Sequence, residues 1–417
     1  MIPLLILTLT LAAGDTLKLD LSKAVDMALR NNLDYKVQSL RHTSSKLDFT
    51  GALTSWMPEP SLQATYSEYA TQYSALTTWK GYSVDLSITQ TILSMQKLAS
   101  LWGSKSDLDR SGATLEEAKN LLAYDVERFY LNVLRESRAM EIQASALRRA
   151  EENLRLIDAK ERLGQASRLD VLNAQVTLNQ SKLGLANATK ELKITKRLLF
   201  NILGIPSVRE VSLVPPPATE AHPKLPPLDD LVSRALEQRP SLRSLDRRVT
   251  GAKADFVEQV VAFLPTISYR WSWEYVGEEF PSPGKFGDEA LKGSGISAGL
   301  SFNPVSYPLS VQRAKTSLDM TNAELMRERL AVVKQVEDAY LAYATAEENL
   351  DLARLTLDAA REGEGLARAQ YRLGLIKSVE LFDAETRLLN AEADYISAVY
   401  DMHLVLSGLR FAVGGGF

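Results

Sequence analysis

The chain has no cysteine and only three histidines among its 417 residues. Without cysteine there is no disulfide, no thiolate metal site and no cysteine nucleophile. The histidines, His42, His222 and His403, are scattered without the spacing of metal ligands, and neither a phosphate-binding glycine loop nor a nucleophile elbow occurs. We therefore expect no enzymatic activity, no metal and no cofactor.

Basic tracts and long apolar runs are scarce as well. The formal net charge of −4 disfavours a nucleic-acid surface. Beyond the N-terminal region no stretch of about 18 uncharged apolar residues occurs, so we do not expect a helical membrane span. Residues 4–14 are apolar and end in Ala13 and Gly14, which predicts a cleaved export signal over residues 1–14. A buried N-terminal strand is the alternative, because no Lys or Arg precedes this run.

What the sequence does have is one long motif written twice. The matches at an offset of 207 include Leu21 with Leu228, Ala28 with Ala235 and Pro58 with Pro265; those at an offset of 210 include Tyr130 with Tyr340, Leu163 with Leu373 and Gly164 with Gly374. Such positional matching over a long stretch indicates internal duplication. It predicts a first repeat over 15–204, a stiff Pro-rich connector over 205–227 and a second repeat over 228–417.

Each repeat is predicted to begin with one amphipathic helix, over about 22–55 and 229–262, which ends before a proline. The pattern then changes to a period of two. The strands that this pattern predicts cover about 60–73, 81–93, 265–277 and 293–303. Alternation of this kind fits a half-buried strand of a soluble sheet as well as a lipid-facing strand.

Aromatic side chains on one predicted strand favour the membrane. Tyr269, Trp271, Trp273 and Tyr275 share one face of that strand, and the residues between them are polar or charged. Aromatic girdles of this kind lie at membrane interfaces. We therefore expect these four side chains to lie at a membrane interface.

Long helices follow the strands in both repeats. Apolar residues recur every seven positions over about 105–163 and 316–373, which predicts helices of about 58 residues, close to 90 Å long. After Gly164 and Gly374 the same spacing returns, so each repeat should contain an antiparallel coiled-coil hairpin.

The two turns between these helices lie at equal register in the duplication. Their sequences are RLGQASRLDVLNAQ (162–175) and YRLGLIKSVELFDAE (371–385). They resemble the twin helix-turn-helix tips of TolC-family outer-membrane efflux proteins, and the duplication and strand pairs extend this resemblance over the whole chain after the signal.

The resemblance implies a mainly α fold in which long helical hairpins form a periplasmic α-barrel and four strands per chain contribute to a shared twelve-stranded β-barrel of a homotrimer. Physically, four strands cannot close a barrel, and although three copies suit a conduit, two are not excluded. The implied function is an outer-membrane exit duct for efflux or secretion, coupled to a periplasmic adaptor and an inner-membrane pump or ABC transporter. Other members often carry a lipid-modified cysteine after the signal, whereas here we expect attachment through the barrel alone.

The resemblance also assigns residues. The adaptor would dock at tips formed by Gly164, Ser167, Gly374, Leu375 and Ser378. The periplasmic gate would comprise two acidic rings, from Glu380 and Asp383, and a bonding network that includes Asp170 and Tyr371. A basic residue that often joins this network is replaced here by Ile376, and Lys377 could substitute for it.

Two alternatives accompany these assignments. Carboxylates just after a turn also stabilise a helix N-terminus, by about 0.3–1 kcal/mol each, without any role in a gate. A soluble periplasmic coiled-coil scaffold would suit the helices, but it leaves the four strands unexplained. The sequence does not identify the cargo, which could be drugs, metal ions or polypeptides, because a wide tunnel selects little.

Overall fold

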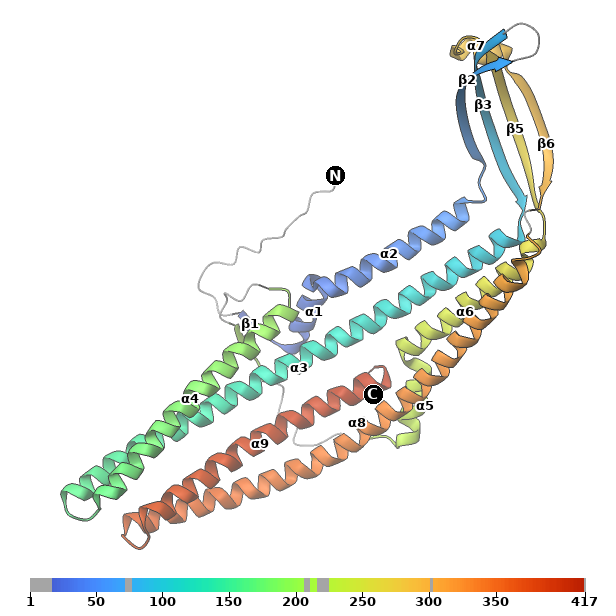
Figure 1. Cartoon of the computed structure of the whole chain (residues 1–417). Helices are drawn as coiled ribbons and strands as arrows, with labels where there is room; N and C mark the ends of the chain where they lie inside the picture. Colours follow the sequence, from blue (N-terminus) through green and yellow to red (C-terminus); the bar gives the residue numbers. More distant parts are fainter. Residues whose placement is uncertain (1–16, 72–76, 206–210, 216–224, 301–302, 416–417) are drawn as a thin grey trace. The chain divides into compact units, whose positions relative to one another are not determined.

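The computed structural model describes residues 17–71, 77–205, 211–215, 225–300 and 303–415 (Figure 1). The predicted export signal and much of the Pro-rich connector lie outside these residues. The chain divides into two compact units: residues 1–38, 116–239 and 330–417 belong to unit 1, and residues 39–115 and 240–329 belong to unit 2. Each unit combines both repeats, and the connector predicted over 205–227 lies inside unit 1.

The two repeats share two helices, two strands and a long helical hairpin in the same order. The first consists of β1 (Leu17–Leu19), α1 (Leu21–Asn31), α2 (Leu33–Thr54), β2 (Glu59–Thr71), β3 (Thr77–Leu93), α3 (Met95–Arg162) and α4 (Arg168–Ile202). The connector holds β4 (Val211–Leu213), and the second repeat consists of α5 (Leu228–Gln238), α6 (Pro240–Val260), the 3-10 turn η1 (Val261–Phe263), β5 (Thr266–Gly277), α7 (Pro283–Glu289), β6 (Leu291–Gly299), α8 (Tyr307–Arg372) and α9 (Ser378–Val413). The offset between matching residues rises from 207 to 210 between Pro265 and Tyr340, and the short helix α7 lies within this longer stretch of the second repeat.

The first predicted helix of each repeat is interrupted, so the prediction of one continuous helix is wrong in both repeats. The breaks are at Asn32, between α1 and α2, and at Arg239, between α5 and α6. Both residues adopt nearly the same extended conformation, with φ −66° and ψ 125° at Asn32 and φ −66° and ψ 123° at Arg239. Pro240 explains the second break, because a proline disfavours helical backbone in the residue before it.

Both breaks pack against the end of the last helix of the same repeat. The Asn32 side-chain amide donates a hydrogen bond to the Ile202 carbonyl at the end of α4. The Arg239 guanidinium lies 5.7 Å from the centre of the Phe411 ring, near the end of α9. Glycines with positive φ make these approaches possible: a Cβ on Gly204 would lie 2.7 Å from the Asn31 carbonyl oxygen, and one on Gly414 would lie 3.0 Å from the Cα of Arg239.

Unit 2 contains a four-stranded antiparallel sheet of order β2-β3-β5-β6. The central pair, β3 and β5, joins the two repeats, with Val84 opposite Tyr275 and Leu86 opposite Trp273. Because opposite residues point to the same side, these pairs form an apolar face, while Asp85 opposite Glu274 belongs to a polar face. The structure therefore contains the predicted strands, and the central pair of the sheet is apolar on one side and polar on the other.

The helical hairpins α3–α4 and α8–α9 (Figure 1) belong to unit 1 from residues 116 and 330 onward. Both long helices begin earlier than predicted, at Met95 and Tyr307, but they end where the turns were predicted. The seven-residue positions are buried as the pattern indicates: Val126 and Val133 in α3, Leu192 and Leu199 in α4, Val336 and Leu357 in α8, and Leu388 and Leu409 in α9. Apolar packing of this kind stabilises each hairpin.

A small parallel sheet in unit 1 was not predicted, because the connector sequence lacks periodicity. Strand β1 pairs with β4, with Leu17 opposite Val211. The fully buried Tyr130 of α3 contacts both strand ends. Its hydroxyl oxygen lies 2.8 and 2.6 Å from the carbonyl oxygens of Leu19 and Val214, which share its single proton, and it accepts from the Val214 N–H at 2.9 Å.

One described helix, α9, is long and apolar enough by composition to cross a membrane. Its apolar residues also pack against the other helices of unit 1: Met402 lies against Tyr343, and Leu388 lies against Leu357. Charged residues such as Asp401 and Arg410 interrupt α9, so it contains no stretch of about 18 uncharged apolar residues.

Candidate functional site

The two turns that carry the predicted docking tips have the same backbone geometry. Gly164 and Gly374 adopt φ values of 73° and 75°, which favour glycine. The N–H groups of Gly164 and Gln165 donate to carbonyls in the last turn of α3, and those of Gly374 and Leu375 do the same for α8. A Cβ on either glycine would meet nothing within 4 Å. Both turns therefore present open backbone to whatever binds there.

Around these turns, apolar side chains are exposed. Leu163 and Leu169 are 73% and 65% exposed, and Leu373 and Leu375 are 75% and 71% exposed. Ser167, predicted to belong to the tip, is the exposed N-cap of α4 and forms a reciprocal capping box with Asp170. The apolar residues are therefore the main surface that the tips offer to a partner.

A direct hydrogen bond links the two hairpins near their tips. The Ser378 hydroxyl, on α9, donates to Asp170 Oδ1, on α4. Ser378 is only 4% exposed, so it belongs to this link and not to the open tip surface. The bond from Ser378 is the largest influence that lowers the pKa of the Asp170 carboxyl, and the bonds from Ser167 come next. Asp170 is therefore ionised at neutral pH.

Tyr371 is held by a base that the sequence did not reveal. Lys160 Nζ, on α3, donates to the Tyr371 carbonyl at 3.0 Å and lies 4.0 Å from the centre of its ring. Within the described residues Asp170 is not hydrogen-bonded to Tyr371, although its negative charge contributes to raising the pKa of that phenol, after burial. Ile376 packs against the same apolar cluster. The basic residue that contacts Tyr371 is thus Lys160 of the facing hairpin and not Lys377.

The two predicted ring carboxylates, Glu380 and Asp383, are exposed on the first turns of α9. Asp383 forms an ion pair of 2.5 Å with Arg387 of the same helix. The charge that Asp383 contributes is therefore partly compensated, whereas the Glu380 carboxylate accepts only a long bond of 3.5 Å from the Lys377 N–H. Of the two, Glu380 is the more available for an ion.

A row of polar pairs lies between the two hairpins, along the contact between α3 and α9. From the tip upward the pairs are Asn153 with Glu385, Arg149 with Glu392, Arg135 with Asp401, and Glu127 with Ser407. Sequence reasoning missed these residues, because nothing in a heptad pattern indicates which helix a polar residue faces. The first pair is the most buried, since Asn153 and Glu385 are 8% and 9% exposed.

The predicted membrane-interface residues share one face of β5, but their surroundings differ. Tyr269 and Trp271 pack edge to face, with ring centres 4.3 Å apart, and Trp271 is 38% exposed. Tyr275 is 5% exposed, because Phe286 and Ala290, at and just after α7, pack over it and over Trp273. Of the four aromatic side chains, Trp271 is thus the exposed one, Tyr269 and Trp273 are half-buried and Tyr275 is buried.

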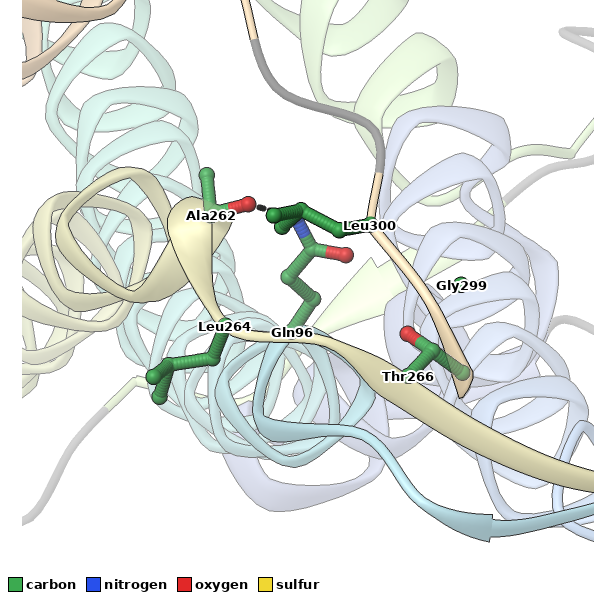
Figure 2. A pocket seen from close by; sticks show the side chains of 6 residues that line it. All are labelled: Gln96, Ala262, Leu264, Thr266, Gly299 and Leu300. Atoms are coloured by element: carbon green, nitrogen blue, oxygen red, sulfur yellow. Dashed lines mark hydrogen bonds between the residues drawn. The ribbon is translucent and has the colours of Figure 1, made fainter. Parts of the chain in front are cut away.

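A pocket of about 370 Å³ lies in unit 2 where helices meet strands. Figure 2 shows its lining, in which the Gln96 amide donates to the Ala262 carbonyl at 3.4 Å. None of its six lining residues is titratable: Gln96, Ala262, Leu264, Thr266, Gly299 and Leu300. The described residues contain no group of three His, Asp or Glu placed to hold a metal ion. The lining of this pocket therefore offers no titratable acid or base.

Comparison with known proteins gives a consistent result. The model of the outer membrane efflux protein family matches residues 24–205 and 231–415. OprJ, an outer membrane protein of Pseudomonas aeruginosa, is 23% identical over an alignment 434 residues long including gaps. The alignment covers 95% of this chain and 84% of OprJ. SrpC, a solvent efflux pump outer membrane protein of Pseudomonas putida, is 23% identical over 315 residues, which cover 73% of this chain and 67% of SrpC.

Among solved structures, the CmeC outer membrane channel of Campylobacter jejuni has the same fold. It superimposes with a TM-score of 0.84 at 18% identity, and the match covers 95% of this chain and 86% of CmeC. The predicted fold class, mainly α with a contribution to a β-barrel, is thereby confirmed.

Proposed function

Because this chain belongs to the outer membrane efflux protein family, we propose that it is one subunit of a passive exit duct in the outer membrane. The observation that carries the proposal is the sheet of unit 2, whose central strand pair has an apolar and a polar face. In the described chain its edge strands, β2 and β6, each pair on one side only. Every backbone group in lipid needs a partner, so such a sheet must be completed by other copies into a closed barrel.

We propose that three copies assemble, and the outer faces of the hairpins support this. Five leucines of α8 lie within a sector of about 60° at 100° per residue and are 54–73% exposed: Leu330, Leu341, Leu352, Leu355 and Leu366. Five apolar residues of α4 lie within about 80° and are 43–65% exposed: Leu172, Val176, Leu183, Ile194 and Leu198. We call these sets the α8 stripe and the α4 stripe. Each would be covered if the α8 stripe of one copy met the α4 stripe of the next.

Disulfide trapping tests this assembly, and the cysteine-free chain makes it clean. Val176 lies seven residues after Leu169, and Leu366 lies seven before Leu373. If the tips are level, Val176 and Leu366 of neighbouring copies should be close. Val176→Cys with Leu366→Cys should give a covalent trimer on oxidation, whereas Val176→Cys with Arg361→Cys, on another side of α8, should not. Covalent dimers as the end point would contradict three-fold assembly.

We further propose that the tips receive a periplasmic adaptor that connects the duct to an inner-membrane efflux pump. Support comes from the exposed leucines and the open backbone of Gly164 and Gly374. The family description and the name of SrpC, a solvent efflux pump protein, favour efflux over polypeptide secretion. Photo-crosslinking from position 375 in cells, followed by mass spectrometry, should capture a periplasmic protein. Capture that is equally strong from position 390, remote from the tip on α9, would contradict docking at the tips.

Conduction tests the duct function and the closure of its periplasmic end, which we call the entrance. The purified protein should produce discrete ion-conducting channels in planar lipid bilayers, with long closed periods that reflect the links between the hairpins near the tips. A soluble scaffold would produce none and would stay in solution after cell lysis without detergent.

A further inference from the structure

A buried polar junction joins three of the long helices behind the tips. Asn153 of α3 donates from Nδ2 to both carboxylate oxygens of Glu385 on α9, at 2.6 and 2.7 Å. Arg368 of α8 approaches the same carboxylate at 3.4 Å and Glu364 at 2.6 Å. The junction therefore ties the first hairpin, through Asn153, to both helices of the second.

This junction is specific in a way that the surrounding apolar packing is not. Leucine contacts tolerate small sliding movements, because dispersion and burial have little directionality. A buried carboxylate keeps its stability only while its partners remain in place, since an uncompensated buried charge is strongly destabilising. Movement of α9 along or away from α3 would separate Glu385 from Asn153 before the apolar contacts were lost.

The position of the junction connects it to the entrance. Glu385 lies seven residues after Ser378, about 10 Å along α9 at 1.5 Å per residue. The hydrogen bond from Ser378 to Asp170 and the contact of Lys160 with Tyr371 lie on the tip side of it. The tip contacts and the junction thus hold the second hairpin against the first at two successive levels.

We propose that Glu385 is a positioning residue for the entrance, which Asn153 and Arg368 hold so that the second hairpin stays in the closed register, and which separates from Asn153 when the entrance opens. The proposal rests on the proposed duct function. It places part of the closing force about two turns along α9 from the hydrogen bond of Ser378 at the tips.

The electrostatic surroundings make this junction sensitive to protons. Burial raises the pKa of the Glu385 carboxyl, and the nearby charge of Glu364 acts in the same direction. The bonds from Asn153 and the positive charges of Arg368 and Arg149 oppose this rise. Arg149 also pairs with Glu392 of α9, at 3.3 Å. Three carboxylates therefore share two guanidinium groups around the junction.

Replacing the amide of Asn153 by a carboxylate tests the proposal in planar bilayers. Asn153→Asp places two carboxylates face to face, so one of them binds a proton far more readily. We expect the open probability to rise about tenfold at pH near 7.5, because a charge-assisted hydrogen bond is replaced by repulsion, and to return toward the wild-type value near pH 5. Adding Glu385→Gln restores an amide facing a carboxylate, with the roles exchanged, and should reverse the effect at both pH values.

Asn390→Asp is the matched control, because it makes the same substitution at an exposed position of α9. If Asn153→Asp behaves like this control at both pH values, the proposal is overturned. If Asn153→Asp fails to assemble, Glu385→Gln alone decides, since it should remove the dependence of closure on pH over this range; an unchanged pH profile overturns the proposal. Absence of channels in the wild-type protein would instead refute the duct function itself.

Discussion

Removing one hydroxyl at the tips should open the entrance. Ser378→Ala deletes the donor to Asp170 Oδ1, and because Ser378 is 4% exposed, water does not readily replace it. The substitution leaves the capping box of Ser167 with Asp170 intact, so α4 keeps its N-terminus. The change therefore acts on the link between the hairpins and not on either hairpin alone.

The expected size follows from the partial burial of this bond. A hydrogen bond to a charged group contributes about 1.5–3 kcal/mol when buried, and about 1 kcal/mol is reasonable here because Asp170 is partly exposed. One copy should then open about fivefold more readily, since a tenfold change corresponds to about 1.4 kcal/mol. If three copies open together, the effect is about 3 kcal/mol, or about 150-fold.

Single-channel recording separates these cases. We expect Ser378→Ala to raise the open probability between about fivefold and 150-fold at neutral pH, with unchanged conductance of the open state. Ser167→Ala, which removes the other side-chain partner of Asp170 within the same hairpin, is the control and should destabilise α4 locally with little effect on opening. Equal effects of the two substitutions would refute a gating role for the bond between Asp170 and Ser378.

Three further outcomes test other parts of the molecule. Rings of Glu380 and Asp383 should make the channel cation-selective and open to block by multivalent cations. Glu380→Gln with Asp383→Asn should weaken both properties in bilayers without disturbing assembly. Unchanged selectivity would mean that both carboxylates only stabilise the helix N-terminus. Trp271→Arg should destabilise the trimer by about 2–4 kcal/mol if Trp271 faces the hydrocarbon midplane, and by less nearer the interface, as measured by thermal dissociation in detergent. Gly204→Ala should cost about 2 kcal/mol or more in thermal unfolding, because its φ is 66° and a Cβ would meet the Asn31 carbonyl, whereas Gly363→Ala in open surroundings should be neutral or stabilising by up to about 1 kcal/mol.

The parts of the fold with strong periodicity could be predicted from the sequence. Seven-residue spacing located the hairpins, because residues such as Val126 and Leu409 must be buried in a two-helix contact. Period-two alternation located the strands, and duplication at a fixed offset placed the turns at Gly164 and Gly374 in equivalent positions. A local sequence pattern is sufficient to predict a helix, strand or turn whose conformation depends on the residues of that element alone.

The bonds of the candidate site could not be predicted in the same way. The resemblance indicated Asp170 and Tyr371, but their partners in the structure, Ser378 and Lys160, come from the facing hairpin. The partnership of Asn153 with Glu385 spans 232 residues, and no local pattern indicates a contact at that separation. By contrast, the break at Arg239 had a local signal in Pro240, which outweighs the helical pattern on either side of it.

Acid should act on the two levels of the entrance in opposite directions. The pKa of Glu385 is raised above its ordinary value of 4.5, so ionisation in the closed state is unfavourable. The junction is then most stable below about pH 4.5 and weakens as pH rises toward the raised pKa. The pKa of Asp170 is lowered from 3.8, so its contribution is complete above that value and is lost only as pH falls through the lowered pKa.

Moderate acid should therefore close the duct, because Glu385 takes up a proton while Asp170 remains ionised and bonded to Ser378. We expect the open probability of the wild-type channel in bilayers to fall between about pH 7.5 and pH 4.5. Ser378→Ala should keep this slope from a higher starting value, because it leaves Glu385 untouched, whereas Glu385→Gln should give a flat profile, because the titrating group is gone. An open probability that rises on acidification over this range would show that the closing effect of protonated Glu385 is outweighed by another group, and the assignment of proton sensitivity to this junction would be wrong.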